Sequence, residues 1–368
     1  VYLFSYFFRG LPPNAGLLQP VKYLIEGPSI VNARDELAHG LGTGIAALVA
    51  NGLHVIGSKA LFASPYREAV QAPHSRNQNV FVFAGENRLG YPTANITGTC
   101  NSSGQGGRFD GDGESAIGFF WGPLTDAGEV EDMDRRLPHF VLARRLEKNY
   151  HGFGKYRGGA CYCEISTPYG EGGCFLSSWG AADKLSHNPG LMAGYMGPPN
   201  PRIIVQDTDL LERIERGEDI DLDNYDLIRD QTLKGTYRIE ASGQTTEKRR
   251  EGDLMMYGLG GGGGYGDVLE RDPALVARDI ADDMITAEVA HRVYGVVIDA
   301  ATGLVDEAAT ADRRAAMRRE RLARGKPFAE FIAAWLDRRP PERITKFYGA
   351  YPEPRVPHYR KPFWGLYD

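Results

Sequence analysis

The sequence predicts an α+β fold, in which a mixed or antiparallel β-rich body is followed by helices gathered at the C-terminal end. Up to about residue 257, short apolar runs such as NVFVFAG (79–85) alternate with glycine- and asparagine-rich turns, a pattern typical of strands. After residue 272, apolar residues recur at helical spacing behind good N-caps. We therefore expect a β-rich body over residues 1–257, a glycine-rich loop and helical segment over 258–325, and a helix with an aromatic tail over 326–368.

Length and charge exclude several classes of protein. A chain of 368 residues can bury a large core without disulfides. Its 42 basic and 48 acidic residues give a net charge of −6, and the basic residues are dispersed outside the run 313–324, which argues against a nucleic-acid surface. No apolar run approaches the roughly 20 residues that span a bilayer. The chain begins in an apolar run without an initiator Met, so we expect it to be the C-terminal part of a longer polypeptide.

The four cysteines are Cys100, Cys161, Cys163 and Cys174. They are too few and too irregularly spaced for a secreted disulfide framework, so we expect a protein of the reducing cytoplasm. On a strand, Cys161 and Cys163 share one face. With Cys174 they could form a three-thiolate site, but without an obvious fourth ligand buried unreactive thiols are the favoured interpretation.

The first elements mix helix with turns. Residues 35–62 are rich in Ala, Leu and Gly at loosely helical spacing, and we expect a buried helix with small-residue contacts. The stretch DGDGES (110–115) could offer oxygen ligands to calcium. It lacks the further acidic residue of an EF-hand loop, so turn chemistry is the favoured interpretation.

Residues 140–166 predict a strand, a glycine-rich turn and a second strand. The turn carries Lys155 and Arg157 among glycines, which could hold an anion because glycine lets backbone N–H groups approach it while the cations supply charge. A loop whose arginine pairs with a carboxylate is an equally good interpretation. The following stretch, 179–205, is punctuated by Gly and Pro and predicts a long loop, in which His187 is the histidine to test first.

Five consecutive glycines follow the apolar strand LMMYG (254–258). The predicted loop comprises Gly260, Gly261, Gly262, Gly263, Gly264, Tyr265, Gly266 and Asp267. A dinucleotide site needs a helix whose N-terminus faces the phosphate, and the next helix begins only at Pro273, so a nucleotide site is disfavoured. We expect the glycines to allow close approach of backbone beneath a substrate chamber or a subunit interface.

The C-terminal signals are stronger. Asp272 is an N-cap before Pro273, and Thr286 caps a second helix that ends at Gly295. A short buried strand (296–299), a helix with a basic second half and an amphipathic helix (328–338) are predicted next. The aromatic tail is expected to dock on this protein or on a partner. Its anchors are Tyr359, Phe363, Trp364 and Tyr367.

Three motifs occur in a particular order: HGFGKYRGG (151–159), GDLMMYGLGGGGGYGDVLERDP (252–273) and DDMITAEVAHRVYGVVID (282–299). Together with GGRFDGDGES (106–115), this set resembles the C-terminal half of the hydantoinase B superfamily. The resemblance implies a partner of the hydantoinase A type, with an actin-like ATPase fold, that binds ATP and phosphorylates the carbonyl oxygen of the substrate. The implied complex is a hetero-oligomer.

The resemblance leaves the reaction open between ketone carboxylation and ATP-dependent amide hydrolysis, and a non-catalytic assembly subunit is a further alternative. The extension after residue 299 resembles the acetone and acetophenone carboxylases and favours a ketone and bicarbonate as substrates. A small zinc-binding subunit is then a possible second partner. The family's metal-binding motifs have no match here, so no metal is expected in this chain, whereas Mg, Mn or Zn could lie elsewhere in the complex. Lys155, Arg157 and His187 are the candidate catalytic residues.

Overall fold

The computed structural model describes residues 42–74, 78–97, 102–118, 128–168, 172–181, 186–239 and 244–336, together with the single residues 10, 16, 19, 22 and 24. The chain divides into two compact units, residues 1–306 and 307–368. The aromatic tail predicted to dock lies outside the described residues, and so does Cys100. The division into three segments stays a prediction.

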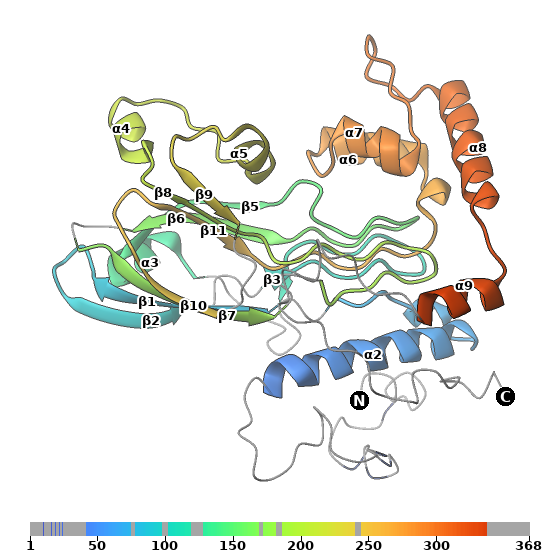
Figure 1. Ribbon diagram of the computed structural model, residues 1–368, viewed down its shortest axis with the longest axis horizontal. Helices are drawn as coiled ribbons and strands as arrows, with labels where there is room; N and C mark the ends of the chain where they lie inside the picture. The colour runs from blue at the N-terminus through green and yellow to red at the C-terminus, as the bar shows by residue number, and fades with distance from the viewer. Residues whose placement is uncertain are drawn as a thin grey trace. The chain divides into compact units, whose positions relative to one another are not determined.

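The first unit contains a five-stranded antiparallel sheet with the strand order β5-β6-β11-β8-β9 (Figure 1). Its strands are β5 His139–Leu146, β6 Tyr162–Pro168, β8 Arg202–Gln206, β9 Thr236–Ile239 and β11 Leu254–Gly258. A four-stranded antiparallel sheet has the order β10-β7-β1-β2. Its strands are β1 Gln78–Glu86, β2 Pro92–Thr97, β7 Cys174–Ala181 and β10 Gln244–Arg249. A short pair joins β3 Ser102–Ser103 to β4 Ile117–Gly118.

The two larger sheets pack face to face. Phe81 and Phe83 of β1 share a buried cluster with Met255 and Tyr257 of β11, and the rings of Phe81 and Tyr257 lie 4.3 Å apart between centroids. The other face of the five-stranded sheet is covered by helices α4 Leu210–Glu215 and α5 Asn224–Asp230, whose leucines complete a second cluster. Burial on both faces explains why every residue of β11 is buried.

One buried polar cluster lies within the interface between the sheets. The Tyr257 hydroxyl donates to Glu164 Oε1 at 2.7 Å, and Arg144 Nε donates to Glu164 Oε2 at 3.0 Å. The His139 ring stacks on Phe83 at 4.1 Å, and burial, followed by the nearby charge of Arg144, lowers the pKa of His139 to about 4. A buried carboxylate therefore has its hydrogen bonds satisfied, while the histidine beside it stays neutral at neutral pH.

The long helix α2 Gly42–Phe62 confirms the helix expected near the start of the described chain, but it is only half-buried. Leu61 packs in a cluster with Val70 and Tyr265. The side chains on the opposite face are about half exposed. They are Leu48 (50%), Val49 (46%), Leu53 (55%) and Ile56 (49%). The fully buried helix predicted from its composition was therefore wrong on this face, because high hydrophobicity does not by itself show that a surface is covered.

The later helices agree with their local signals. Helix α6 Pro273–Ala281 begins behind Asp272, whose carboxylate accepts from the Ala274 N–H at 2.9 Å. Helix α7 Ala287–Val289 is capped by Thr286 and continues as a π-helical turn to Tyr294, where Gly295 adopts φ 63°. The strand predicted at 296–299 is absent from this described part of the chain, where Ile298 forms only an isolated bridge with Val305. The α+β prediction is thus confirmed, with antiparallel sheets. The gathering of helices at the C-terminal end is confirmed only in part, since the long helix α2 and the shorter α4 and α5 precede residue 272.

In the second unit the structure describes two helices, α8 Glu307–Ala323 and α9 Phe328–Leu336. Both were predicted from their spacing and composition.

Candidate functional site

The backbone of Gly260–Gly266, which follows β11, forms hydrogen bonds with several other segments of the chain. We call this run, together with the segments that bond to it, the glycine bed. Gly262 N–H donates to Gly159 O at 3.1 Å, Gly263 N–H to Pro73 O at 3.0 Å, and Gly264 N–H to Tyr195 O at 2.9 Å. In return, Gly152, Gly107 and Leu191 donate to the carbonyls of these same three glycines.

Successive residues of the bed bond to different neighbours. Gly262 and Tyr265, three positions apart, both bond to the 152–159 segment, whereas Gly263 and Gly264 bond to other parts of the chain. A polyproline II helix has three residues per turn and no internal hydrogen bonds, so residues three positions apart point to the same neighbour. The hydrogen bonds of Gly262–Tyr265 are those expected of such a helix surrounded by other segments of the chain. The arrangement is therefore a bundle of backbones and not a flexible linker.

Glycine is required here because backbone meets backbone. A Cβ atom added at Gly262 would lie closer than 3.0 Å to the Gln105 carbonyl, and one added at Gly158 would lie equally close to the Gly262 carbonyl. Real Cβ atoms do not reach that distance, and neither neighbour is a side chain that could move aside. The close approach predicted for this run is thus a property of the structure, while the chamber or interface above it stays a prediction.

The same hydrogen bonds argue against a phosphate-binding loop. The N–H groups of Gly260, Gly262, Gly263, Gly264, Tyr265 and Gly266 all donate to acceptors within the chain. A phosphate-binding loop needs free N–H groups that converge on the anion. The glycine run does not offer them.

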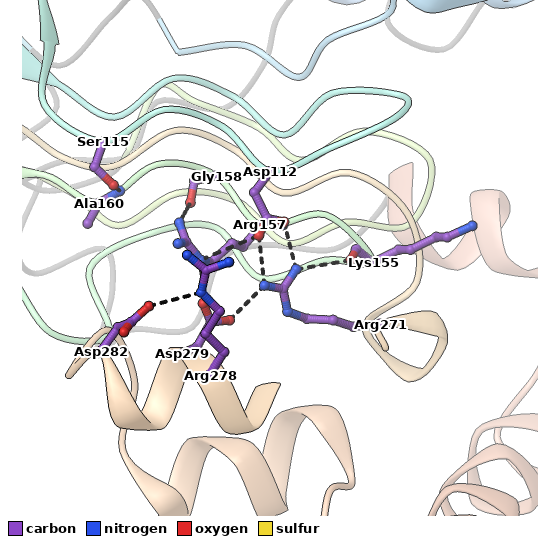
Figure 2. A network of polar contacts seen from close by, with 10 residues as sticks. All are labelled: Asp112, Ser115, Lys155, Arg157, Gly158, Ala160, Arg271, Arg278, Asp279 and Asp282. Carbon is purple, nitrogen blue, oxygen red and sulfur yellow. Dashed lines mark hydrogen bonds and ion pairs between the residues drawn. The ribbon is translucent and has the colours of Figure 1, made fainter. Parts of the chain in front are cut away.

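A closed network of charges fastens the bed to helix α6 (Figure 2). Arg271 donates from Nη1 to Asp112 Oδ1 at 2.6 Å and from Nη2 to Asp112 Oδ2 at 2.8 Å, and it also reaches Asp279 at 2.7 Å. Arg157 donates from Nε to Asp279 Oδ1 at 2.9 Å. The charges of the two arginines are therefore balanced by those of two aspartates. Of the two interpretations of this loop, the structure agrees with the one in which Arg157 pairs with a carboxylate.

Burial alone would raise the pKa of Asp112, but the hydrogen bond and the charge of Arg271, followed by the charge of Arg157, lower it below the usual range. Burial works against the charge of Arg271, yet Asp112 raises the pKa of this guanidinium further above its ordinary value. The guanidinium lies 5.9 Å from the Tyr294 ring centroid. Asp112 and Arg271 therefore keep their charges at neutral pH.

Lys155 is held differently from Arg157. Its carbonyl accepts from Arg271 Nη1 at 3.2 Å and its N–H donates to Gly266 O at 3.2 Å, so the backbone is fixed by the network and the bed. Its ammonium group lies 5.5 Å from the Tyr156 ring centroid and has no carboxylate partner among the residues that the structure describes. Of the two predicted cations, only Arg157 is paired with a carboxylate in the described part of the chain.

His187 lies against another part of the bed. The Asn51 side chain donates to the His187 carbonyl at 2.5 Å, and Asn188 Nδ2 donates to Gly261 O at 3.0 Å. Helix α2 and the bed thus position the loop predicted at 179–205. Lys155 and Arg157 bond near Gly266 and α6, so the structure brings all three predicted residues onto the bed but at different points of it.

His151 was not among the predicted site residues. It is 1% exposed, and neither ring nitrogen has a hydrogen-bond partner among the described residues. Burial, followed by the charges of Arg157 and Arg271, lowers its pKa well below the ordinary value. Its ring contacts Phe153 edge to face at 5.2 Å. One indication in the sequence that His151 belongs to the site is its position in the stretch HGFG (151–154). The glycines on both sides of Phe153 allow other backbone segments to approach this stretch closely.

The cysteines do not gather into one site. Cys161 and Cys163 lie 3.7 Å apart between Sγ atoms in the cluster beneath α4 and α5, whereas Cys174 belongs to the cluster between the sheets. Burial raises the pKa of Cys161, and it raises that of Cys174 to about 12, so these thiols stay protonated. Within the described ranges, no group of three or more His, Cys, Asp or Glu residues is placed to hold a metal ion. None of the helices described there is long and apolar enough to cross a membrane.

Comparison with known proteins places these features in a family. The acetophenone carboxylase delta subunit of Aromatoleum aromaticum is 29% identical over 358 residues, which cover 96% of this chain and 52% of the relative. The solved structure of nucleotide-free acetone carboxylase is similar with a TM-score of 0.69 and 28% identity, over 79% of this chain and 39% of that one. The structure of ATP-dependent caprolactamase from Pseudomonas jessenii shares the fold, with a TM-score of 0.60 and 22% identity over 85% of this chain and 50% of that one.

The chain thus spans about half the length of the acetophenone carboxylase subunit that it matches. The family model for hydantoinase B/oxoprolinase matches residues 1–268, which include both sheets and the whole glycine bed. The resemblance of the ordered glycine motifs is thereby confirmed. The chain belongs to the hydantoinase B/oxoprolinase family.

Proposed function

We propose that this chain is the hydantoinase B type subunit of an ATP-dependent ketone carboxylase. One observation carries the proposal: the similarity to the acetophenone carboxylase delta subunit extends over 96% of the chain and so continues well beyond the family domain. The ATP site belongs to a hydantoinase A type partner in a hetero-oligomer, and a small zinc-binding subunit is a possible further member. The complex works in the cytoplasm, as the cysteine usage predicts.

The reaction joins a ketone to bicarbonate-derived carbon dioxide. A base removes a proton from the carbon next to the carbonyl, and the enolate oxygen takes the γ-phosphoryl group of ATP, which leaves ADP. Bicarbonate takes up the proton and loses water, which gives carbon dioxide. The enol phosphate carbon then donates its electron pair to carbon dioxide, which forms the new C–C bond. Water takes the phosphoryl group as inorganic phosphate, and the product is a β-keto carboxylate. Any Mg, Mn or Zn that assists lies elsewhere in the complex.

In this proposal the glycine bed forms one wall of the substrate site, with its backbone fixed by hydrogen bonds, and Lys155 supplies positive charge. Bicarbonate, the enol phosphate and the carboxylate product are all anions, and the Lys155 ammonium lacks a carboxylate partner in the described part of the chain. Arg157 acts through its pair with Asp279, which holds the loop in place. His187 is the candidate for proton transfer, because its loop is anchored on the bed by Asn51 and Asn188.

The alternative is an ATP-dependent amide hydrolase, in which water attacks a phosphorylated amide. The fold shared with caprolactamase is compatible with it. A third interpretation is an assembly subunit without catalytic residues.

The purified complex decides between them. Carboxylation predicts ATP hydrolysis that depends on a ketone such as acetophenone or acetone, with labelled bicarbonate entering the product. ATP hydrolysis driven by a lactam or hydantoin, without a ketone, would overturn the proposal. If alanine at Lys155 and His187 leaves turnover unchanged in an intact complex, the assembly interpretation holds instead.

A further inference from the structure

His151 lies in the interior of the first unit, and its ring forms no hydrogen bond with the described residues. The residue is 1% exposed, and neither Nδ1 nor Nε2 has a partner in that part of the chain. A polar group that is buried without a partner costs free energy, and most buried polar groups are bonded to protein or to ordered water. An imidazole buried in this way therefore points to a ligand.

The ring is held between the glycine bed and aromatic side chains. It contacts the Phe153 ring edge to face at 5.2 Å, and Phe153 in turn contacts the Tyr294 ring at 5.8 Å. Tyr294 is fully buried in the π-helical turn that follows α7. On the backbone side, a Cβ atom added at Gly261 would lie only 2.7 Å from His151 Cα. These contacts fix the place of the ring but satisfy neither of its nitrogens.

The charges near His151 keep the ring neutral. Burial, followed by the charges of Arg157 and Arg271, lowers its pKa well below the ordinary value. A neutral imidazole has one N–H group that donates and one bare nitrogen that accepts. Its ligands must therefore accept at one edge of the ring and donate at the other.

These charges also decide against an ion as the ligand. A metal ion would bind only the bare nitrogen and would face the positive charges of Arg157 and Arg271. Within the described ranges, no set of three or more His, Cys, Asp or Glu residues is placed to share such an ion. An anion gains little, because Asp112 and Asp279 already balance the two arginines. Water is neutral, and it both donates and accepts.

We propose that the His151 imidazole is a binding site for internal water. One water molecule accepts from the N–H group of the ring and another donates to the bare nitrogen, because the two nitrogens lie on different edges of the ring. The water completes the polar interior where the glycine bed meets the π-helical turn. The inference goes beyond the proposed function and holds whichever reaction the complex catalyses.

The first test observes the water in the full chain by NMR. Histidine labelled at its ring nitrogens is incorporated, and the His151 signal is identified by its loss in His151→Gln. We expect a ring N–H proton that exchanges slowly with solvent at neutral pH and receives magnetisation from water through a nuclear Overhauser effect. The exposed His291 is the control, and fast exchange should remove its N–H signal. A His151 N–H signal that receives nothing from water would overturn the proposal.

The second test compares two replacements of similar volume. His151→Gln keeps a donor and an acceptor for the water, whereas His151→Leu keeps neither. The melting temperature of the Leu variant should lie about 2–5 °C below that of the Gln variant. His291→Gln and His291→Leu form the matched control pair and should agree within about 1 °C. A Leu variant at position 151 that is as stable as the Gln variant would mean that the imidazole has no ligand to lose.

A crystal structure of the parent chain decides the matter if His151→Leu does not fold. The proposal expects density for a water molecule within about 3.2 Å of a ring nitrogen of His151. An ion at that place, or protein groups that bond both nitrogens, would refute it. None of these measurements uses a substrate, so their outcome is separate from the test of ketone carboxylation.

Discussion

Arg271 and Asp112 form an ion pair through two hydrogen bonds, and the arginine side chain is only 1% exposed. Both residues also bond to the backbone of the 155–157 segment, which is part of the glycine bed. Asp112 comes from the loop before β4, and Arg271 lies two residues before α6, so the pair joins that loop to the start of the helix (Figure 2). The stability of the bed should therefore depend on this contact.

Replacing Arg271 with Met should destabilise the protein by about 3 kcal/mol, because Asp112 and the 5% exposed Asp279 would each lose one of their two arginine partners and keep only Arg157. Arg271→Lys keeps the charge but not the planar fork and should cost less. Urea unfolding measures both. The matched control is Arg278→Met, whose pair with Asp282 is exposed (75% and 55%), and which should cost less than about 1 kcal/mol. Equal losses for Arg271 and Arg278 would refute the role of the network.

Alanine at Gly262 should abolish or strongly weaken folding, since its Cβ would overlap the Gln105 carbonyl. Alanine at Gly52 is the control. This glycine lies within α2 with no atom near a built Cβ, so its replacement should be neutral or stabilise the protein by up to about 1 kcal/mol. Soluble yield and melting temperature decide the matter. A Gly262→Ala variant as stable as the parent would mean that the bed tolerates side chains.

Replacing Lys155 with Gln should raise the KM for bicarbonate in the assembled complex by about tenfold or more while the melting temperature stays unchanged. The reason is that the ammonium contributes charge to a ligand and not to an ion pair of the described chain. Lys248→Gln, at an exposed position of β10, is the control. A loss of stability without a change in KM would assign Lys155 a purely structural role.

Stability should fall as the pH drops from about 6.5 to 4. Burial lowers the pKa values of His54, His74 and His139 to about 4, with His54 also acting on His74 and Arg144 on His139. In the unfolded chain these groups titrate near 6.5, so in this window the unfolded state binds protons that the folded state does not. Burial also lowers the pKa of His151 well below the ordinary value, so this ring is a fourth such group. The free energy of unfolding should therefore be constant above about pH 7.5 and decline with a slope approaching four protons below about 6. His74→Asn should reduce the slope by about one proton, and a flat profile would contradict the burial of these rings.

Tyr257→Phe should cost about 1–3 kcal/mol, because Glu164 would stay buried after losing the 2.7 Å hydrogen bond from the hydroxyl. Tyr91→Phe, at a 65% exposed position, should change the free energy of unfolding by less than about 0.5 kcal/mol. Denaturant titration of the two variants side by side provides the comparison. Equal stabilities would mean that Glu164 finds another donor.

The elements that could be predicted are those with local signals. β1, β5, β6 and β11 are apolar runs between turn residues, and α6 has both its cap at Asp272 and its proline. β10 was missed as a strand because its sequence, QTTEKR, is polar, as suits its position at the sheet edge. β8 was missed because its short apolar run follows a Pro-rich stretch and was included in the predicted loop.

The site could be predicted only in part, because its contacts join distant segments. The structure brings the glycine run and the turn with Lys155 and Arg157 together, but nothing local shows that Arg271 would bond to Asp112 and Asp279. The same holds for His151, whose burial depends on segments from several parts of the chain. The exposed face of α2 shows the converse, since its composition predicted burial that the described structure does not provide.

The glycine bed also has a consequence for the order of folding. Its segments are contributed by residues near 73, 105, 155, 190 and 262, and the glycines at its centre have no side chains with which to attract one another. Such a bundle cannot nucleate by hydrophobic collapse, and it must wait until the sheets have closed the long loops between its segments. We expect its amide protons to gain protection from exchange later during refolding than those of β6 and β11. Once formed, the bed should open only when the segments that surround it separate, because its backbone hydrogen bonds join all of them.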